Sequence, residues 1–250
     1  MKLNGKQYDK FILNGKTYEK FYLNNKIYQS LDPGLILDLP LQNNFTDYSA
    51  SGISMVAGGT SNQPTFALSG RKAGEYCAVF TGSQSIKTTT NLPIGTDKIG
   101  ISFWMKPTVA SGTQMIFELS DNIGATNAFY IDFGESASKI VTRDGNAGLN
   151  NIKSNNTALT TSTWNHVFVN IDRSKNAANT ITIYLNNVLQ SLTTMYSLNQ
   201  DTTGIFGNYI FYIGQRAGSS LGFKGSLTKL KIYNYPFTAG EVSTLHNSEL

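Results

Sequence analysis

The chain has 250 residues, of which 40% are hydrophobic, 12% aromatic and only 14% charged. This length can bury one sizeable core, and the composition excludes a disordered chain. Apolar runs are short and are separated by Asn, Thr, Ser and Gly, which excludes a helical bundle and favours many strands joined by tight turns. The single cysteine, Cys77, cannot form an internal disulfide, so we expect it to be a small buried side chain.

The positive charge is confined to the start of the chain. Residues 1–31 hold six lysines against Asp9 and Glu19, which accounts for the whole net charge of +4. Because the remainder is neutral, we expect no nucleic-acid partner. No apolar run reaches the roughly 18 residues of a membrane span, and residues 1–6 lack the apolar centre of a secretory signal. We therefore expect neither a membrane partner nor secretion.

Three ten-residue repeats open the chain, beginning at Leu3, Leu13 and Leu23: LNGKQYDKFI, LNGKTYEKFY and LNNKIYQSLD. Their Asn-Gly and Asn-Asn dipeptides, at residues 4–5, 14–15 and 24–25, predict type I′ hairpin turns. The eight residues between turns suit a strand. The repeats thus predict a four-stranded meander, in which a turn at 14–15 makes these opposite pairs: Tyr8 with Phe21, Asp9 with Lys20, Lys10 with Glu19, and Phe11 with Tyr18.

In this register both faces of the meander carry aromatic residues. Tyr8 and Phe21 share one face, whereas Phe11, Tyr18 and Tyr22 share the other. A thin sheet of this kind should bury at least one face against something outside itself. We therefore expect residues 1–31 to dock on a partner or to form a homo-oligomer. The alternative is a meander folded onto the chain's own main domain, residues 32–250. The proposed docking residues are Tyr8, Phe11, Tyr18, Phe21, Tyr22 and Tyr28.

Alternating apolar residues predict most of the main domain to be β-structure. Such segments occur at residues 99–105, 167–171, 181–185, 209–213 and 229–233. Residues 186–187, Asn-Asn, predict a further hairpin turn. Regularly spaced strands without long amphipathic helices favour an antiparallel sandwich. A capping box over residues 238–241 predicts one short helix near the C-terminus.

A family resemblance rests on motifs spread over residues 35 to 247: LILDLPL (35–41), DYSASG (47–52), YCAVFTGS (76–83), ISFWMKP (101–107), TWNHV (163–167), IYLNN (183–187), FKGSL (223–227) and KIYNYPF (231–237). In this order and spacing they resemble the laminin-G-like, concanavalin A-like lectin/glucanase domains. The resemblance implies an all-β jelly-roll sandwich of two curved sheets, here preceded by the small meander. Because this scaffold hosts sugar binders, adhesion modules and some glycosidases, it leaves function open. We expect Trp104 and Trp164, which lie in motif positions, to be core side chains.

The acidic residues do not form a glycosidase pair. Such enzymes hold two carboxylates about 5–5.5 Å or about 6.5–9.5 Å apart, and the glucanases that this chain resembles use alternate positions of one strand. Glu118 with Asp121, and Asp132 with Glu135, are three residues apart and so fall on opposite faces of a strand. We interpret them as solvated loop or strand-end charges. Because neither histidine falls in a nucleophile motif, we expect no enzymatic activity.

Calcium is left open as an alternative to having no cofactor. Many members of the family bind Ca²⁺ on a loop rim, where six to eight oxygen ligands are needed. The sequence has no EF-hand pattern, and residues 143–146 are equally compatible with an Asp-Gly hairpin turn. The loop-like candidate ligands are Asp47, Asp121, Asn122, Asp144 and Asn146. For a sugar ligand we expect contacts from loops 120–128, 143–156 and 199–209, since loops on a rigid sandwich carry specificity.

The sequence combines a lectin-like domain with no signal, disulfide or anchor. Virion proteins share this combination because they assemble in the host cytoplasm and are released by lysis. The Asn-Gly-Lys-x-Tyr repeats also resemble short repeats of bacteriophage structural proteins. We therefore expect a virion surface protein, such as a head fibre, decoration protein or tail-associated adhesin. Its residues 1–31 would bind a capsid or tail protein, and its sandwich would bind cell-surface glycan with avidity from several copies.

Two alternatives to this function remain open. One is a purely structural virion protein without a ligand. The other is a secreted bacterial or eukaryotic carbohydrate-binding adhesion module, whose location would be extracellular. In that case residues 1–31 would be dispensable.

Overall fold

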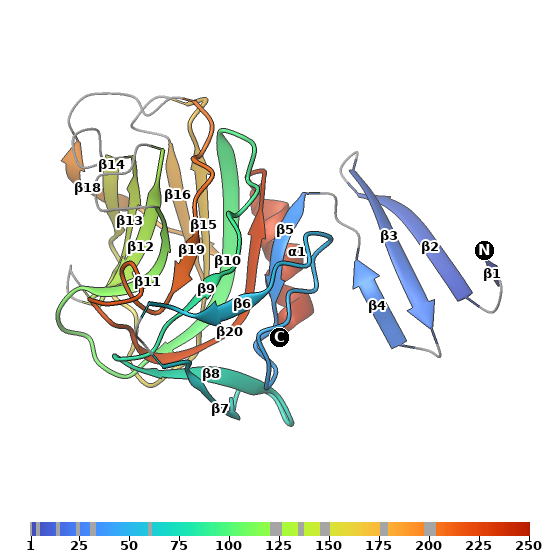
Figure 1. Ribbon diagram of the computed structural model, residues 1–250. Helices are drawn as coiled ribbons and strands as arrows, with labels where there is room; N and C mark the ends of the chain where they lie inside the picture. The colour runs from blue at the N-terminus through green and yellow to red at the C-terminus, as the bar shows by residue number, and fades with distance from the viewer. Residues whose placement is uncertain are drawn as a thin grey trace.

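The computed structural model describes residues 2–3, 6–13, 16–23, 26–30, 34–59, 62–120, 127–134, 138–145, 151–175, 180–197 and 204–250. For residues 2–30, 151–153 and 196–197 the description is confined to the backbone. The described residues form three antiparallel sheets and one helix (Figure 1). Two of the sheets form a sandwich, so the predicted all-β sandwich with one short C-terminal helix is confirmed.

The N-terminal sheet is a meander in the order β1-β2-β3-β4. Between β2 and β3, Tyr8 pairs with Phe21, Asp9 with Lys20, Lys10 with Glu19, and Phe11 with Tyr18, which confirms the predicted register. The predicted turns at residues 4–5, 14–15 and 24–25 lie outside the described residues. The strands are β1 (Lys2–Leu3), β2 (Lys6–Leu13), β3 (Lys16–Leu23) and β4 (Lys26–Ser30).

The first sheet of the sandwich has the strand order β17-β16-β15-β10-β20-β8-β7, and β5 also pairs with β20. Its central strands, β10 and β20, are each ten residues long. The strands are β5 (Leu35–Leu39), β7 (Thr65–Leu68), β8 (Tyr76–Thr81), β10 (Lys98–Pro107), β15 (Asn165–Asp172), β16 (Ile181–Leu185), β17 (Val188–Leu189) and β20 (Lys224–Tyr233).

The second sheet has the strand order β18-β14-β13-β12-β11-β19-β9-β6. In Figure 1 it forms the left-hand layer of the sandwich. The strands are β6 (Met55–Ala57), β9 (Ile86–Thr88), β11 (Gln114–Leu119), β12 (Phe129–Phe133), β13 (Ile140–Asp144), β14 (Asn151–Asn155), β18 (Leu192–Ser197) and β19 (Phe211–Ile213).

The core lies between these two sheets, because alternate side chains of each strand point inward. Phe103 of the first sheet meets Phe117 of the second edge to face, with ring centroids 4.8 Å apart. Phe117 in turn stacks on Phe211 at 5.6 Å. All five predicted β segments fall in β10, β15, β16, β19 and β20, although β19 begins only at Phe211. Cys77 is buried, as expected.

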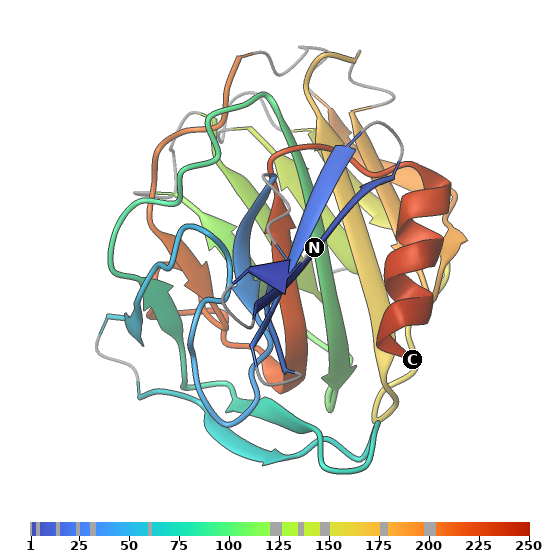
Figure 2. The same ribbon diagram turned by 90° about the vertical axis from the view of Figure 1, so that its right-hand side faces the viewer.

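The helix α1 (Ala239–Glu249) covers the outer face of the first sheet (Figures 1 and 2). Thr238 and Glu241 form the predicted capping box. Val242 packs on Phe168 and Tyr184 of the sheet, which anchors the helix. Of the helices in the described ranges, none has the length and apolar character needed to cross a membrane.

Candidate functional site

A continuous row of side chains crosses the outer face of the second sheet. Arg143 of β13 pairs with Tyr130 of β12, and Tyr130 pairs with Glu118 of β11. Glu118 pairs with Tyr212 of β19, which pairs with Lys87 of β9. Directly opposed residues of an antiparallel pair project from the same face. We call these five residues, Arg143, Tyr130, Glu118, Tyr212 and Lys87, the tyrosine row.

The row faces away from the sandwich core. Its sequence neighbours Phe117, Leu119, Phe129 and Ile131 belong to the core cluster, so the intervening side chains point outward. Exposure along the row is uneven: Lys87, Tyr212 and Arg143 are half-buried, Tyr130 is only 5% exposed, and Glu118 is fully buried. The accessible groups of the row are thus one tyrosine and two cations.

Glu118 holds the turn that follows β19 against this face. Its carboxylate accepts hydrogen bonds from the Ser120 hydroxyl and from the backbone N–H of Ala217, the latter at 2.7 Å. Burial raises the pKa of Glu118, although these hydrogen bonds and the nearby charge of Arg216 oppose that effect. The Arg216 guanidinium lies 6.0 Å from the Tyr130 ring centroid. Its buried Nε has no hydrogen-bond partner among the described residues, and Arg216 adds a third cation beside the row.

The interpretation of Glu118 and Asp132 as solvated charges is wrong. Both side chains are fully buried and lie on the outward side of neighbouring strands. Asp132 forms an ion pair with Arg143, with Nε and Oδ2 3.2 Å apart. The burial of Glu118 and Asp132 could not be predicted from their spacing in the sequence, because it depends on how the strands pair. Their suggested partners, Asp121 and Glu135, lie outside the described residues.

Arg173, directly after β15, gathers the three loops that were expected to bind sugar. Its Nε donates to Asp144 Oδ1 at 2.8 Å, at the start of loop 143–156. Its Nη atoms donate to the Asn127 side chain and the Ala128 carbonyl in loop 120–128, and to the carbonyls of residues 204 and 205 in loop 199–209. The guanidinium also lies 3.8 Å from the Phe206 ring centroid.

The ion pair between Arg173 and Asp144 is inaccessible to solvent, since both side chains are 0% exposed. A buried guanidinium with one carboxylate and four further acceptors is fully engaged and fixes its neighbours in place. Arg173 was not predicted from the sequence. The available signal was an arginine directly after an apolar strand, in a chain with few arginines.

Two of the calcium candidates have protein partners instead. Asp47 accepts hydrogen bonds from the backbone N–H groups of Asp38, Ser49 and Ile53 and from the Ser49 hydroxyl. Asp144 is bound by Arg173 and pairs with Asn151 as the last residue of β13, so it is not part of a two-residue turn. Asp121, Asn122 and Asn146 lie outside the described residues. Over the described ranges, no three His, Cys, Asp or Glu side chains converge as metal ligands would.

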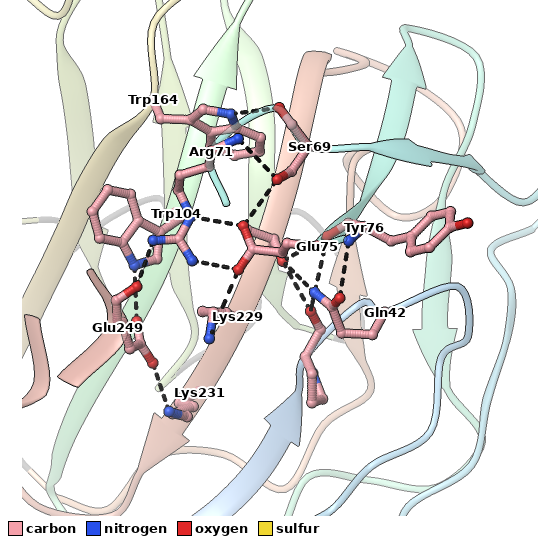
Figure 3. A network of polar contacts seen from close by, with 12 residues as sticks. Gln42, Ser69, Arg71, Glu75, Tyr76, Trp104, Trp164, Lys229, Lys231 and Glu249 are labelled. Carbon is pink, nitrogen blue, oxygen red and sulfur yellow. Dashed lines mark hydrogen bonds and ion pairs between the residues drawn. The ribbon is translucent and has the colours of Figure 1, made fainter. Parts of the chain in front are cut away.

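The two tryptophans lie in a polar network between the first sheet and the C-terminal helix (Figure 3). Trp104 is buried, as expected, and donates from Nε1 to Glu249 at 2.8 Å. The expectation of a core position is wrong for Trp164, which is half-buried and donates to the Ser69 carbonyl, while Lys106 approaches its ring. Trp104, being buried, therefore offers no ring face to a sugar.

The network also ties the end of the helix to the sheet. Lys231 forms an ion pair with Glu249 at 2.6 Å, and Arg71 donates to the Glu249 backbone carbonyl. Arg71 binds Glu75 through two nitrogens and lies 4.3 Å from the Trp104 ring centroid. Burial alone would raise the pKa of Glu249, but the charge and hydrogen bond of Lys231 lower it.

His166 completes this network as a neutral side chain. Its Nε2 lies 2.9 Å from the Ser102 hydroxyl, and its ring packs against Trp104 at 5.1 Å. Burial lowers the pKa of His166 to about 4, with the nearby Glu249 charge opposing the effect. Since Ser102 and His166 are both fully buried, this pair has a packing role and no access to a substrate.

The expected docking residues are placed by backbone register only. Tyr8 lies opposite Phe21, and Phe11 opposite Tyr18. Tyr22 lies opposite Ile27, beside a register shift between β3 and β4. The surroundings of these side chains and of Tyr28 lie outside what the structure describes, so docking through them stays a prediction.

Comparison with known proteins supports the same architecture. A laminin-G family model described as "Concanavalin A-like lectin/glucanases superfamily" matches residues 80–243. No curated protein sequence matches the chain. Among solved structures, domain 4 of an extracellular GH43 arabinanase from Geobacillus stearothermophilus, in complex with arabinotriose, is similar with a TM-score of 0.63 and 17% identity. That match covers 85% of this chain and 98% of the other.

Two neurotoxin structures are similar to a comparable degree. Botulinum neurotoxin type C, whose cell entry depends on interaction with two ganglioside molecules, gives a TM-score of 0.64 at 14% identity, over 88% of this chain and 52% of the other. The binding domain of botulinum neurotoxin DC in complex with SialylT gives 0.62 at 15% identity, over 87% and 52%. The chain thus spans about half the length of these two. At such identities the likeness shows the fold alone.

Proposed function

Because the chain belongs to the concanavalin A-like lectin/glucanases superfamily, we propose that it is a non-enzymatic glycan-binding protein whose ligand lies along the tyrosine row. The observation that carries this proposal is the register that aligns two tyrosines with charged side chains across five neighbouring strands. An aromatic ring offers an apolar face to a sugar ring, and flanking charged side chains bind the hydroxyl and acid groups of the sugar.

The charges favour an acidic glycan. Lys87, Arg143 and Arg216 are half-buried and reach the surface, whereas Glu118 and Asp132 are fully buried. Among the described residues of this face, a ligand therefore meets cations, while the carboxylates of Glu118 and Asp132 are covered. A saccharide bearing a carboxylate fits this arrangement better than a neutral one. The glycan complexes of the arabinanase and neurotoxin domains support sugar binding on this fold by analogy.

The acidic residues on this face support binding rather than hydrolysis. Glycoside hydrolysis needs one carboxyl group to protonate the leaving oxygen and a second to act at the anomeric carbon. Glu118 is held by Ser120 and Ala217, and Asp132 by Arg143. Because neither side chain is exposed, neither reaches a glycosidic bond above the sheet.

The setting that we propose is a bacteriophage virion. Its support is the N-terminal sheet, whose register matches the one expected of a tandem docking repeat. The repeats would attach the chain to a capsid or tail protein or join copies of it, and the sandwich would present the tyrosine row. A structural virion protein without ligand and a secreted adhesion module are the competing proposals.

A glycan array probed with the full-length protein tests the binding proposal. We expect binding to acidic oligosaccharides, and we expect Tyr212→Ala to weaken it at least tenfold by removing the accessible ring of the row. Tyr48→Ala is the matched control, because Tyr48 is 46% exposed and lies outside the row. Absence of any glycan ligand would favour the purely structural alternative, whereas equal losses in both variants would place the ligand away from the tyrosine row.

A further inference from the structure

A cavity of about 250 Å³ opens on the other side of the sandwich, beside the start of α1. It lies between β15, β16 and the segment that leads into the helix. In Figure 2 the helix, in red, runs beside these yellow to orange strands. Because the cavity is on the first sheet and the tyrosine row on the outer face of the second, the two lie on opposite sides of the molecule.

One wall of the cavity is aromatic and rigid. Phe237 is half-buried, and its ring packs on Phe168 at 4.8 Å and on Tyr235 at 5.2 Å with an interplanar angle of 11°. Asn170 fixes the Phe237 backbone from both sides: it accepts from the Phe237 N–H at 2.8 Å and donates to the carbonyl at 3.0 Å. This ring is held in place before any ligand arrives, which reduces the entropy cost of binding.

The opposite wall supplies hydrogen-bonding groups. Within the described residues, no hydrogen bond engages the hydroxyl of Tyr184, whose ring is otherwise packed under the helix. Thr182 accepts from Asn170 at 3.2 Å, and its hydroxyl donates to no acceptor among the described residues. Asp172 and Lys175 complete this wall, with Nζ and Oδ2 3.7 Å apart.

The charge of this wall is balanced, unlike that of the tyrosine row. Burial alone would raise the pKa of Asp172, but hydrogen bonds from Ser174 and the charges of Lys98 and Lys175 lower it, so the carboxylate is ionised. The lining of the cavity holds one ionised carboxylate and one ammonium group and so carries no net charge, and Lys98, outside the lining, also pairs with Asp172. Hydroxyl groups of a ligand can donate to Asp172 and accept from Lys175 and Thr182.

We propose that this cavity is a second saccharide site that takes one neutral hexopyranose ring. The C–H face of the sugar lies on Phe237, and its hydroxyls bond to Tyr184, Thr182, Asp172 and Lys175. One molecule then holds two glycan sites of different charge preference on opposite sides, so a single copy can bridge two glycan chains.

NMR titration of the full-length protein with neutral methyl hexopyranosides, in the gluco, galacto and manno series, tests this site. We expect at least one of them to shift the amide signals of residues 180–184 and 237. Tyr184→Phe and Thr182→Val each remove one hydroxyl with little change in shape, and should raise the Kd about three- to tenfold. Tyr212→Phe, the same change in the tyrosine row, should leave this Kd unchanged.

The proposal is overturned if no hexopyranoside shifts these amides up to its solubility limit, or if Tyr184→Phe and Thr182→Val both bind like the unaltered protein. Neither result bears on the proposed acidic-glycan site at the tyrosine row, because binding there is measured separately with an acidic oligosaccharide and with Tyr212→Ala. Conversely, loss of acidic-glycan binding alone would count against the row and not against the cavity.

Discussion

Replacing Arg173 by methionine would show whether one buried guanidinium organises the loop rim. Methionine keeps much of the apolar stem but removes the guanidinium that is ion-paired with the buried Asp144 carboxylate. Breaking a buried ion pair from one side costs about 3–5 kcal/mol. Domains of this kind have about 5–15 kcal/mol in total, so we expect a folded but clearly weakened protein. Urea unfolding gives the free-energy difference from the shift in midpoint at constant m-value.

A second substitution separates the charge from the loop contacts. In Arg173→Met/Asp144→Asn both charges of the ion pair are gone, so a large part of the lost stability should return. The carbonyls of Gly204 and Ile205 still lack the Arg173 donor, and the Ala128 carbonyl keeps only the Gly145 N–H, so loop order should not return. Hydrogen exchange reports this loop order through the amides of residues 145 and 207, which bond to residues 128 and 127.

Lys98→Met is the matched control, because the Lys98 side chain is 35% exposed and its Nζ lies 3.5 Å from Asp172. Such a pair contributes about 0–1 kcal/mol. The reasoning is refuted if Arg173→Met costs no more than this control. It is equally refuted if the double variant restores amide protection together with stability.

Three further predictions concern pH, the helix and the repeats. As pH falls from about 6.5 toward 4, the free energy of unfolding should fall by up to about 3 kcal/mol. Burial lowers the pKa of His166 in the folded protein to about 4, so the histidine of the unfolded chain takes up its proton first. If His166→Gln left the pH dependence of stability unchanged, this prediction would be contradicted. Glu249→Gln should cost about 3 kcal/mol in urea unfolding by leaving Lys231 unpaired, and a loss below 1 kcal/mol would refute the role of this pair. Deleting residues 1–31 should abolish particle incorporation or self-association while leaving glycan affinity intact, and normal incorporation would rule out the docking role.

Local sequence signals were sufficient where neighbouring residues decide the structure. The pattern of the repeats was sufficient to predict the β2–β3 register, although the turn at residues 14–15 lies outside the described residues. The capping box defines the start of α1, and the Asn186-Asn187 pair, with φ of 48° and 67°, forms the predicted hairpin between β16 and β17. In each case the interacting groups are close in the chain.

The candidate site could not be predicted in the same way. The tyrosine row exists only once five strands are in register, and an alternating pattern within one strand does not specify its neighbour's register. Arg173 contacts Asp144 and Asn127, 29 and 46 residues away. Likewise, Glu118 and Asp132 look like ordinary surface charges until the sheet and its covering turn bury them. The three loops expected to contact sugar lie only partly within the described residues, so that expectation stays a prediction.

The central claim is that an acidic glycan lies along the tyrosine row. A crystal structure of the full-length protein with an acidic oligosaccharide selected by the array tests it most directly. We predict a sugar ring over Tyr212, with its acid group in contact with Lys87 or Arg216. Density for the acidic sugar elsewhere, with the outer face of the second sheet empty, would contradict the account.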